Sequence, residues 1–188
     1  MKALWSPRAL AFGLWLAVLT YSFVYLSRFN NTPGETIAPR LHFGEKLARP
    51  LMLVFLHPHC KCSSATLAEL ERLLPIVGDS AEIRIAFTVP HGEDASWAKS
   101  GLLERAKTLK SVDVHLDTER LASYLGAKTS GTVFLFDKTG DLVFEGGITP
   151  SRGHEGDSPG KFFIMDWLTR GQSSLPDRSL TFGCELEG

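Results

Sequence analysis

The chain has few cysteines, no internal repeat, no low-complexity tract and no excess of charge of either sign. Three cysteines in 188 residues are too few for a disulfide-dense scaffold, and the ordinary balance of 44% hydrophobic to 22% charged residues argues against a disordered or collagen-like chain. Twenty Lys and Arg residues against 21 Asp and Glu residues create no positive field for phosphates, so nucleic acid is not an expected partner. A chain of this length is expected to form one domain with a substantial core.

Only one long hydrophobic run is present, and it lies near the N-terminus. The 19 residues from Ala9 to Ser27 carry no charge and would span about 28 Å as a helix, which matches a bilayer core. Lys2 and Arg8 precede the run and Arg28 follows it, a bias that keeps the N-terminus in the cytoplasm. We therefore predict a transmembrane anchor over residues 1–28, with the remaining chain on the periplasmic or extracytoplasmic side.

Two alternatives to an anchor stay open. A cleaved signal peptide needs small residues one and three before the cut, whereas Tyr25 and Leu26 crowd that zone. A buried core helix that is apolar on all faces needs a larger protein around it. The polar residues 29–39 contain two prolines and are interpreted as a linker, which places the domain at 40–170 and a tail at 171–188.

The chain after the linker alternates predicted strands and helices. The apolar run Leu51–Leu56 is typical of a strand buried on both faces in a parallel sheet. Ser63 or Ser64 can cap the helix that follows it. Strands are predicted over 51–56, 82–89, 112–116, 132–136 and 142–145, and helices over 63–78, 95–109, 118–125 and from 161 onward. This order indicates an α/β domain with a βαβ unit and a C-terminal hairpin.

The cysteines are the main candidates for chemistry. Cys60 and Cys62 follow the central strand and precede a helix, so the positive end of the helix should favour the thiolate of Cys60. A Cys60–Cys62 disulfide would close a very small ring and should be easily reduced, as catalytic or regulatory disulfides are. Cys184 in the tail is a candidate resolving thiol or third metal ligand. A structural pair, or a free buried cysteine at 184, remains the alternative.

Histidines lie close to the cysteines in the sequence. His57 and His59 flank Pro58 just before Cys60, where an imidazolium would stabilise a thiolate and a neutral imidazole could take the thiol proton. His59 is the better candidate, and two solvated loop histidines are the alternative. His154 lies in a polar loop, which either stays at the surface or folds back to reach the cysteines.

The apolar strand, cysteine pair and helix, followed by a βαβ unit and a terminal ββα unit, resemble the thioredoxin-like superfamily over roughly residues 40–170. The segment LVFLHPHC aligns with the family's strand and its approach to the nucleophilic cysteine, here Cys60. The resemblance implies a central mixed sheet flanked by helices. Two features depart from the family: Lys61 alone separates the cysteines, and Gly131 replaces the cis-proline that faces them. Gly131 either opens the backbone so that a ligand could approach closely or is an ordinary loop glycine.

The segments SRGHEGDS at 151–158 and FGCEL at 182–186 resemble the membrane-anchored redoxin branch of RedB type. This resemblance implies redox chemistry and no particular substrate; we predict a membrane-anchored thiol–disulfide oxidoreductase that acts on a protein disulfide or thiol. Cys60 attacks, Cys62 resolves the mixed disulfide, and Cys184 relays electrons. No organic cofactor is implied, because no Gly-rich phosphate loop follows a strand.

Two other functions compete with redox chemistry. The first is copper or zinc handling of Sco type, with Cys60, Cys62 and His154 as ligands. The second is a docking module that keeps the fold without the chemistry. Metal binding that depends on Cys60 would favour the first function, and indifference to its replacement would favour the second.

Overall fold

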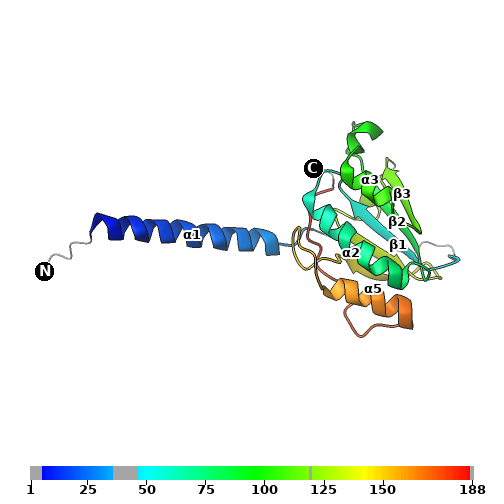
Figure 1. The fold of residues 1–188 in the computed structure, drawn as a ribbon. Helices are drawn as coiled ribbons and strands as arrows, with labels where there is room; N and C mark the ends of the chain where they lie inside the picture. The colour runs from blue at the N-terminus through cyan, green and yellow to red at the C-terminus, as the bar shows by residue number, and fades with distance from the viewer. Residues whose placement is uncertain (1–5, 36–45, 119, 187–188) are drawn as a thin grey trace.

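A long N-terminal helix leads into an α/β domain in this computed structural model, which describes residues 6–35, 46–118 and 120–186 (Figure 1). Helix α1 (Pro7–Asn31) has no buried residue and is long and apolar enough to cross a membrane. It continues three residues into the predicted linker, because Asn31 and Thr32 donate side-chain hydrogen bonds back to carbonyls of the preceding turn. The predicted domain start at residue 40 lies outside the described residues.

Five strands form one mixed sheet, as the sequence predicts. The strands are β1 (Leu51–Leu56), β2 (Glu82–Thr88), β3 (Val112–Asp117), β4 (Thr132–Phe136) and β5 (Leu142–Gly146). Their order is β3-β2-β1-β4-β5, with parallel pairing among the first three strands and antiparallel pairing of β4 with β1 and β5. Two parallel crossovers followed by an antiparallel hairpin give the thioredoxin-like fold, with β1 at the centre.

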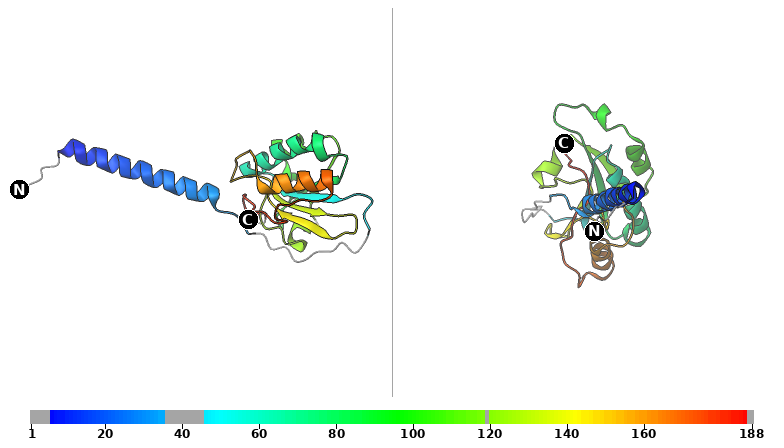
Figure 2. Two further views of the ribbon diagram at one scale, coloured as in Figure 1. Left: turned by 90° about the horizontal axis from the view of Figure 1, so that it is seen from below. Right: turned by 90° about the vertical axis from the view of Figure 1, so that its left-hand side faces the viewer.

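The sheet separates two apolar clusters. All six residues of β1 are buried because successive side chains point to opposite faces. One face of the sheet is covered by α2 (Lys61–Val77), α3 (Gly101–Lys107) and α5 (Pro159–Arg170). Their apolar residues pack against alternate residues of β1 in one cluster. The other face packs against α4 (Leu121–Tyr124) and against Leu186 near the C-terminus. Figure 2 shows α2 and α5 side by side on one face of the sheet, with α1 projecting away from the domain.

Helices α2, α3 and α4 differ from their predicted bounds for local reasons. Helix α2 begins at Lys61, so the predicted cap at Ser63 or Ser64 is wrong, and Cys60 occupies the N-cap position. The predicted helix 95–109 is divided into a 3₁₀ turn over Ala95–Ala98 and α3, because the Ser100 side chain accepts the Leu103 N–H and starts a new helix. The predicted helix 118–125 shortens to α4, whose first N–H groups are bound by the Asp117 carboxylate.

The tail after α5 returns across the domain. Gly34 donates its N–H to Thr181 O, and Leu186 donates its N–H to Lys128 O. Leu186 is fully buried in the cluster of the second face. The tail is therefore packed into the domain and brings Cys184 to the end of the sheet where α2 begins.

Candidate active site

Cys60 stands at the junction between the central strand and α2. Its backbone is extended (φ −92°, ψ 125°), and its carbonyl accepts the Ser63 N–H as the helix begins. The N–H groups of the first helical turn have no partners within the helix and concentrate partial positive charge there. Cys60 is therefore in a position that favours an anionic sulfur when it is reduced.

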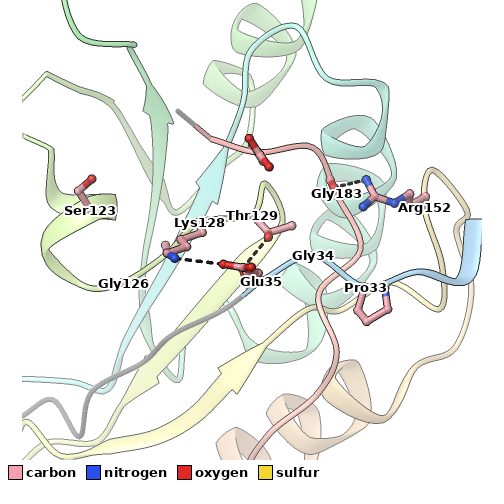
Figure 3. A pocket seen from close by; sticks show the side chains of 11 residues that line it. Pro33, Gly34, Glu35, Ser123, Gly126, Lys128, Thr129, Arg152 and Gly183 are labelled. Carbon is pink, nitrogen blue, oxygen red and sulfur yellow. Dashed lines mark hydrogen bonds and ion pairs between the residues drawn. The ribbon is translucent and has the colours of Figure 1, made fainter. Parts of the chain in front are cut away.

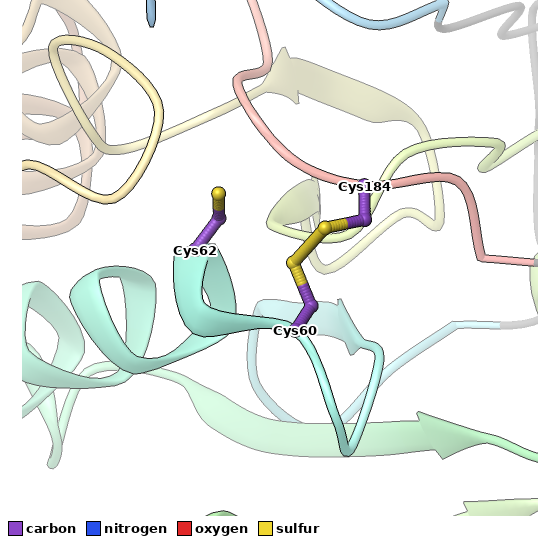
Figure 4. Close-up of side chains that lie close together, drawn as sticks. All are labelled: Cys60, Cys62 and Cys184. Atoms are coloured by element: carbon purple, nitrogen blue, oxygen red, sulfur yellow. A yellow bond between two sulfur atoms is a disulfide. The ribbon is translucent and has the colours of Figure 1, made fainter.

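The disulfide in this structure joins Cys60 to Cys184, across 124 residues of sequence and a Cα–Cα distance of 6.3 Å (Figure 4). Cys62 is a free cysteine. The expected Cys60–Cys62 pair is thus not the pair observed, because the packed tail presents a sulfur to Cys60 without closing a small ring. The three sulfurs all lie within 4.8 Å of one another, so either Cys62 or Cys184 is within reach of Cys60.

The tail covers the sulfur of Cys60. Cys60 is only 6% exposed, whereas Cys62 is partly exposed and Cys184 is accessible to solvent. In the oxidised form a reductant would therefore reach the disulfide most readily at Cys184. Reduction removes the covalent link that keeps the tail over Cys60.

A network of hydroxyl groups fixes the loop before Cys60. The Ser63 hydroxyl donates to His57 O at 2.8 Å, and the Ser130 hydroxyl accepts the His57 N–H at 2.9 Å. The two hydroxyl oxygens are 2.7 Å apart. Because the Ser63 hydroxyl proton is already donated to His57 O, the Ser130 hydroxyl is the donor to Ser63 Oγ. The approach to Cys60 is thereby attached to the segment before β4.

The two predicted tuning histidines contact each other and Trp97. His57 Nδ1 accepts the His59 N–H at 3.1 Å, and both rings meet the Trp97 ring edge to face. His59 Nε2 lies 2.7 Å from Trp97 O, so this nitrogen is engaged with a carbonyl rather than aimed at a thiol. Burial, together with the charge of His59, lowers the pKa of His57 below its ordinary value of 6.5. His57 is therefore held neutral, with Nδ1 as the acceptor.

Stability should depend on pH through His57. The pKa of His57 is lower in the folded than in the unfolded protein, so the unfolded protein binds a proton at this site more readily. The free energy of unfolding is therefore highest above pH 6.5 and decreases as the pH falls from 6.5 through the folded-state pKa. His57→Asn keeps an acceptor but cannot titrate, so denaturation midpoints should fall less steeply below pH 6.5 than in the wild type. His154→Asn replaces an exposed ring and should change stability by about 0.5 kcal/mol at most. Equal slopes for wild type and His57→Asn would contradict this role.

Gly131 faces α2 next to the cysteines. It has a positive φ of 94°, and its N–H donates to Phe55 O at 2.8 Å. A Cβ at this position would lie 2.8 Å from the hydroxyl oxygen of Thr66, which is buried without a hydrogen-bond partner. The described residues contain no cis peptide bond. Close approach to α2 and the left-handed conformation together require glycine here.

His154 does not join the cysteines. Its ring is exposed, and its Nδ1 lies 2.7 Å from Arg152 O within its own loop. The metal-ligand set Cys60, Cys62 and His154 is therefore not assembled, because the loop is held elsewhere. The group of potential ligands that does converge consists of the three cysteine sulfurs. In the fully reduced protein these sulfurs offer a soft donor set suited to Cu(I) or Zn²⁺.

Glu69 on α2 holds the polar loop 151–158 in place. Its carboxylate is fully buried and accepts hydrogen bonds from the Gly156 N–H at 2.8 Å and from Lys161 Nζ at 2.9 Å. Arg72 pairs with Glu69 and also with Glu155. Burial by itself would raise the pKa of Glu69, but these donors and positive charges outweigh it and lower the pKa.

A pocket of about 660 Å³ adjoins the tail beside Cys184 (Figure 3). Gly183 and Glu185, on either side of Cys184, both line it. Lys128 forms an ion pair with Glu35 at 3.1 Å inside the pocket. Arg152 donates to Gly183 O, so the backbone next to Cys184 is held by a guanidinium group.

Several residues of the site escaped the sequence analysis. Ser130 and Trp97 carry no motif, and their roles depend on contacts between distant segments. Thr66 and Glu69 follow Cys62 at helical spacing (i+4 and i+7), which gives α2 a buried polar stripe. A glutamate within the leucine-rich segment of a core helix is a usable signal, because a buried charge requires a partner.

No protein-family model and no curated protein matches the chain. Among solved structures, the domain is similar to an uncharacterized conserved protein from Geobacillus kaustophilus, with 17% identity, a TM-score of 0.59, and coverage of 85% of this chain and 94% of that one. It is also similar to a hypothetical protein from Sinorhizobium meliloti 1021, with 16% identity, a TM-score of 0.58, and coverage of 83% and 94%. A thioredoxin-like superfamily protein matches with 15% identity, a TM-score of 0.47, and coverage of 76% and 100%.

Proposed function

We propose that the protein is a membrane-anchored, extracytoplasmic thiol–disulfide oxidoreductase. The observation that carries this proposal is the meeting of three cysteine sulfurs within 4.8 Å at the first turn of α2. A disulfide next to a third thiol, at a helix N-terminus that stabilises thiolates, is suited to thiol–disulfide exchange. The fold supplies this position directly after the central strand β1.

The reaction begins with the reduced protein. The Cys60 thiolate attacks one sulfur of a partner disulfide, so that a Cys60–partner disulfide forms and the other partner sulfur leaves as a thiolate. The thiolate of Cys184 then attacks Cys60 Sγ, which releases the second partner sulfur and closes the Cys60–Cys184 disulfide. Two electrons pass from the protein to the partner. The same steps in reverse oxidise a partner dithiol.

The sequence names Cys62 as the resolving cysteine and Cys184 as a further candidate, and we assign the role to Cys184 because it is the residue bonded to Cys60. Cys62 can exchange into the same disulfide, since its sulfur lies within the same 4.8 Å. His57 and Ser130 position the segment before Cys60 through the hydroxyl network, and His59 adds positive charge nearby when protonated.

Helix α1 is assigned as a single membrane span with a cytoplasmic N-terminus, and the chain is assigned to the RedB-like redoxin branch. Three features support this: the length and apolar surface of α1, the basic residues before it, and the segments 151–158 and 182–186. An oxidising compartment outside the cytoplasm fits a disulfide between the domain and its tail.

The purified full chain in detergent provides the test. Mass spectrometry after thiol blocking should find a Cys60–Cys184 linkage that dithiothreitol reverses, and the reduced protein should cleave insulin disulfides. Absence of both would overturn the proposal. Stoichiometric Cu(I) binding by the reduced protein, lost in Cys60→Ser, would then favour the metal-handling function, and indifference of both readouts to Cys60→Ser would favour a docking module.

A further inference from the structure

The tail binds the domain as an extended peptide ligand would. Ser130 donates its N–H to Cys184 O at 2.8 Å, and Leu186 donates its N–H to Lys128 O at 2.9 Å. Thr129 and Glu185 form an antiparallel bridge. These bonds use only backbone groups, so any extended segment could form them. The surface over residues 128–131, called here the tail site, is therefore not restricted to the tail by its hydrogen bonds.

The position before the cysteine is restricted in size. A Cβ on Gly183 would lie closer to Ser130 O than the 3.0 Å that real Cβ atoms keep, and the neighbour is backbone that cannot rotate away. Arg152 also donates to the Gly183 carbonyl. A ligand segment must therefore have glycine immediately before its cysteine in order to bring that sulfur to Cys60.

The second position after the cysteine is restricted in polarity. Leu186 is fully buried and belongs to an apolar cluster with β1, β4 and α4. Glu185, which lies between Cys184 and Leu186, is exposed, so the position directly after the cysteine accepts a polar side chain. A large aliphatic side chain at the second position contributes binding because it is removed from water, whereas a small or charged one does not.

We propose that the tail site selects partner polypeptides that carry an extended Gly-Cys-x-Leu segment, in which x is any polar residue and Leu stands for a large aliphatic side chain. This inference rests on the proposed function and names its partner class. The chain's own residues 183–186 occupy the tail site when Cys60 and Cys184 are bonded. When the tail is released, a partner segment takes its place and its cysteine forms the disulfide with Cys60 in the same geometry.

The test uses the reduced full chain carrying Cys62→Ser and Cys184→Ser, so that Cys60 is the only thiol. The probe is the synthetic peptide SLTFGCELEG with its cysteine bonded to 2-nitro-5-thiobenzoate. The Cys60 thiolate attacks the peptide sulfur, a Cys60–peptide disulfide forms, and coloured thionitrobenzoate leaves as the thiolate. Its release gives the rate, and the mass of the adduct confirms the product.

Three variant peptides separate the two selected positions from a control. Changing the glycine to alanine, or the leucine to alanine, should slow the reaction about tenfold or more. Changing the glutamate between cysteine and leucine to alanine should leave the rate within about twofold. The symmetric aromatic disulfide of thionitrobenzoate, which has no peptide, measures the intrinsic reactivity of Cys60.

The outcomes distinguish the two proposals. Equal rates for all four peptides, together with normal reactivity toward the small disulfide, would overturn the Gly-Cys-x-Leu selectivity and leave the oxidoreductase function standing. Failure of Cys60 to react with the small disulfide as well would overturn the proposed function itself. A rate that falls for the glycine and leucine variants alone supports the selectivity.

Discussion

Replacing Cys60 by serine should lower the rate of insulin disulfide reduction by roughly three orders of magnitude or more, because the attacking thiolate is lost and neither remaining thiol takes its place. Cys60 alone occupies the N-cap position of α2, where the free N–H groups of the first turn stabilise an anionic sulfur. Cys62 lies within the first turn and Cys184 lies on the tail. Insulin turnover and the rate of thiol alkylation measure the loss.

The other two cysteines provide the matched controls. Cys184→Ser should still attack insulin but should accumulate more mixed disulfide at Cys60 than the wild type, because the sulfur that is bonded to Cys60 is missing and only Cys62 remains to resolve it. Cys62→Ser should retain most of the turnover. A mixed disulfide that accumulates in Cys62→Ser instead would reverse the two roles, and full activity in Cys60→Ser would remove the proposed nucleophile.

Replacing Glu69 by alanine should lower the free energy of unfolding by about 2–3 kcal/mol, because the largely buried ammonium of Lys161 then keeps only the exposed Asp157 as a charged partner. The Glu69 side chain is fully buried, and that of Lys161 is 14% exposed. The change also removes the acceptor for the Gly156 N–H, which holds the polar loop against α2. Equilibrium denaturation of the full chain in detergent measures the loss.

Glu71→Ala is the control for charge removal on the same helix. Glu71 pairs with Arg105 at 2.6 Å, but both side chains are substantially exposed, so its loss should cost about 0–1 kcal/mol. The double change Glu69→Met with Lys161→Met should recover much of the stability, because it removes both charges together. Similar losses for Glu69→Ala and Glu71→Ala would contradict a structural role for the buried carboxylate.

The fold could be predicted from the sequence because its strands have strong local signals. The bounds of β1 and β4 are as predicted, since runs of mainly apolar residues bounded by proline, glycine or polar residues mark a buried strand at both ends. The predicted helix 95–109 was wrong because Ser100 competes locally for the backbone N–H groups that a continuous helix would use. Such competition depends on one side-chain conformation, which periodicity does not reveal.

The parts of the candidate site that could be predicted are those that depend on residues close together in the sequence. The position of Cys60 before α2 follows from the strand and the helix on either side of it. The disulfide partner of Cys60 cannot be inferred in this way, because Cys184 reaches Cys60 through contacts of the tail. These contacts include the burial of Leu186 against the far face of the sheet. Of the two positions that the sequence left open for His154, the structure has the surface one, because Glu69 holds its loop by contacts that no motif encodes.

Arg152 connects the segment that carries Cys184 to the end of the long N-terminal helix. Its backbone N–H donates to Asn30 O, its Nε donates to Thr32 O, and a second guanidinium nitrogen donates to the residue just before Cys184. Where α1 is inserted in a bilayer, these three hydrogen bonds fix the orientation of the disulfide relative to the end of the membrane-spanning helix.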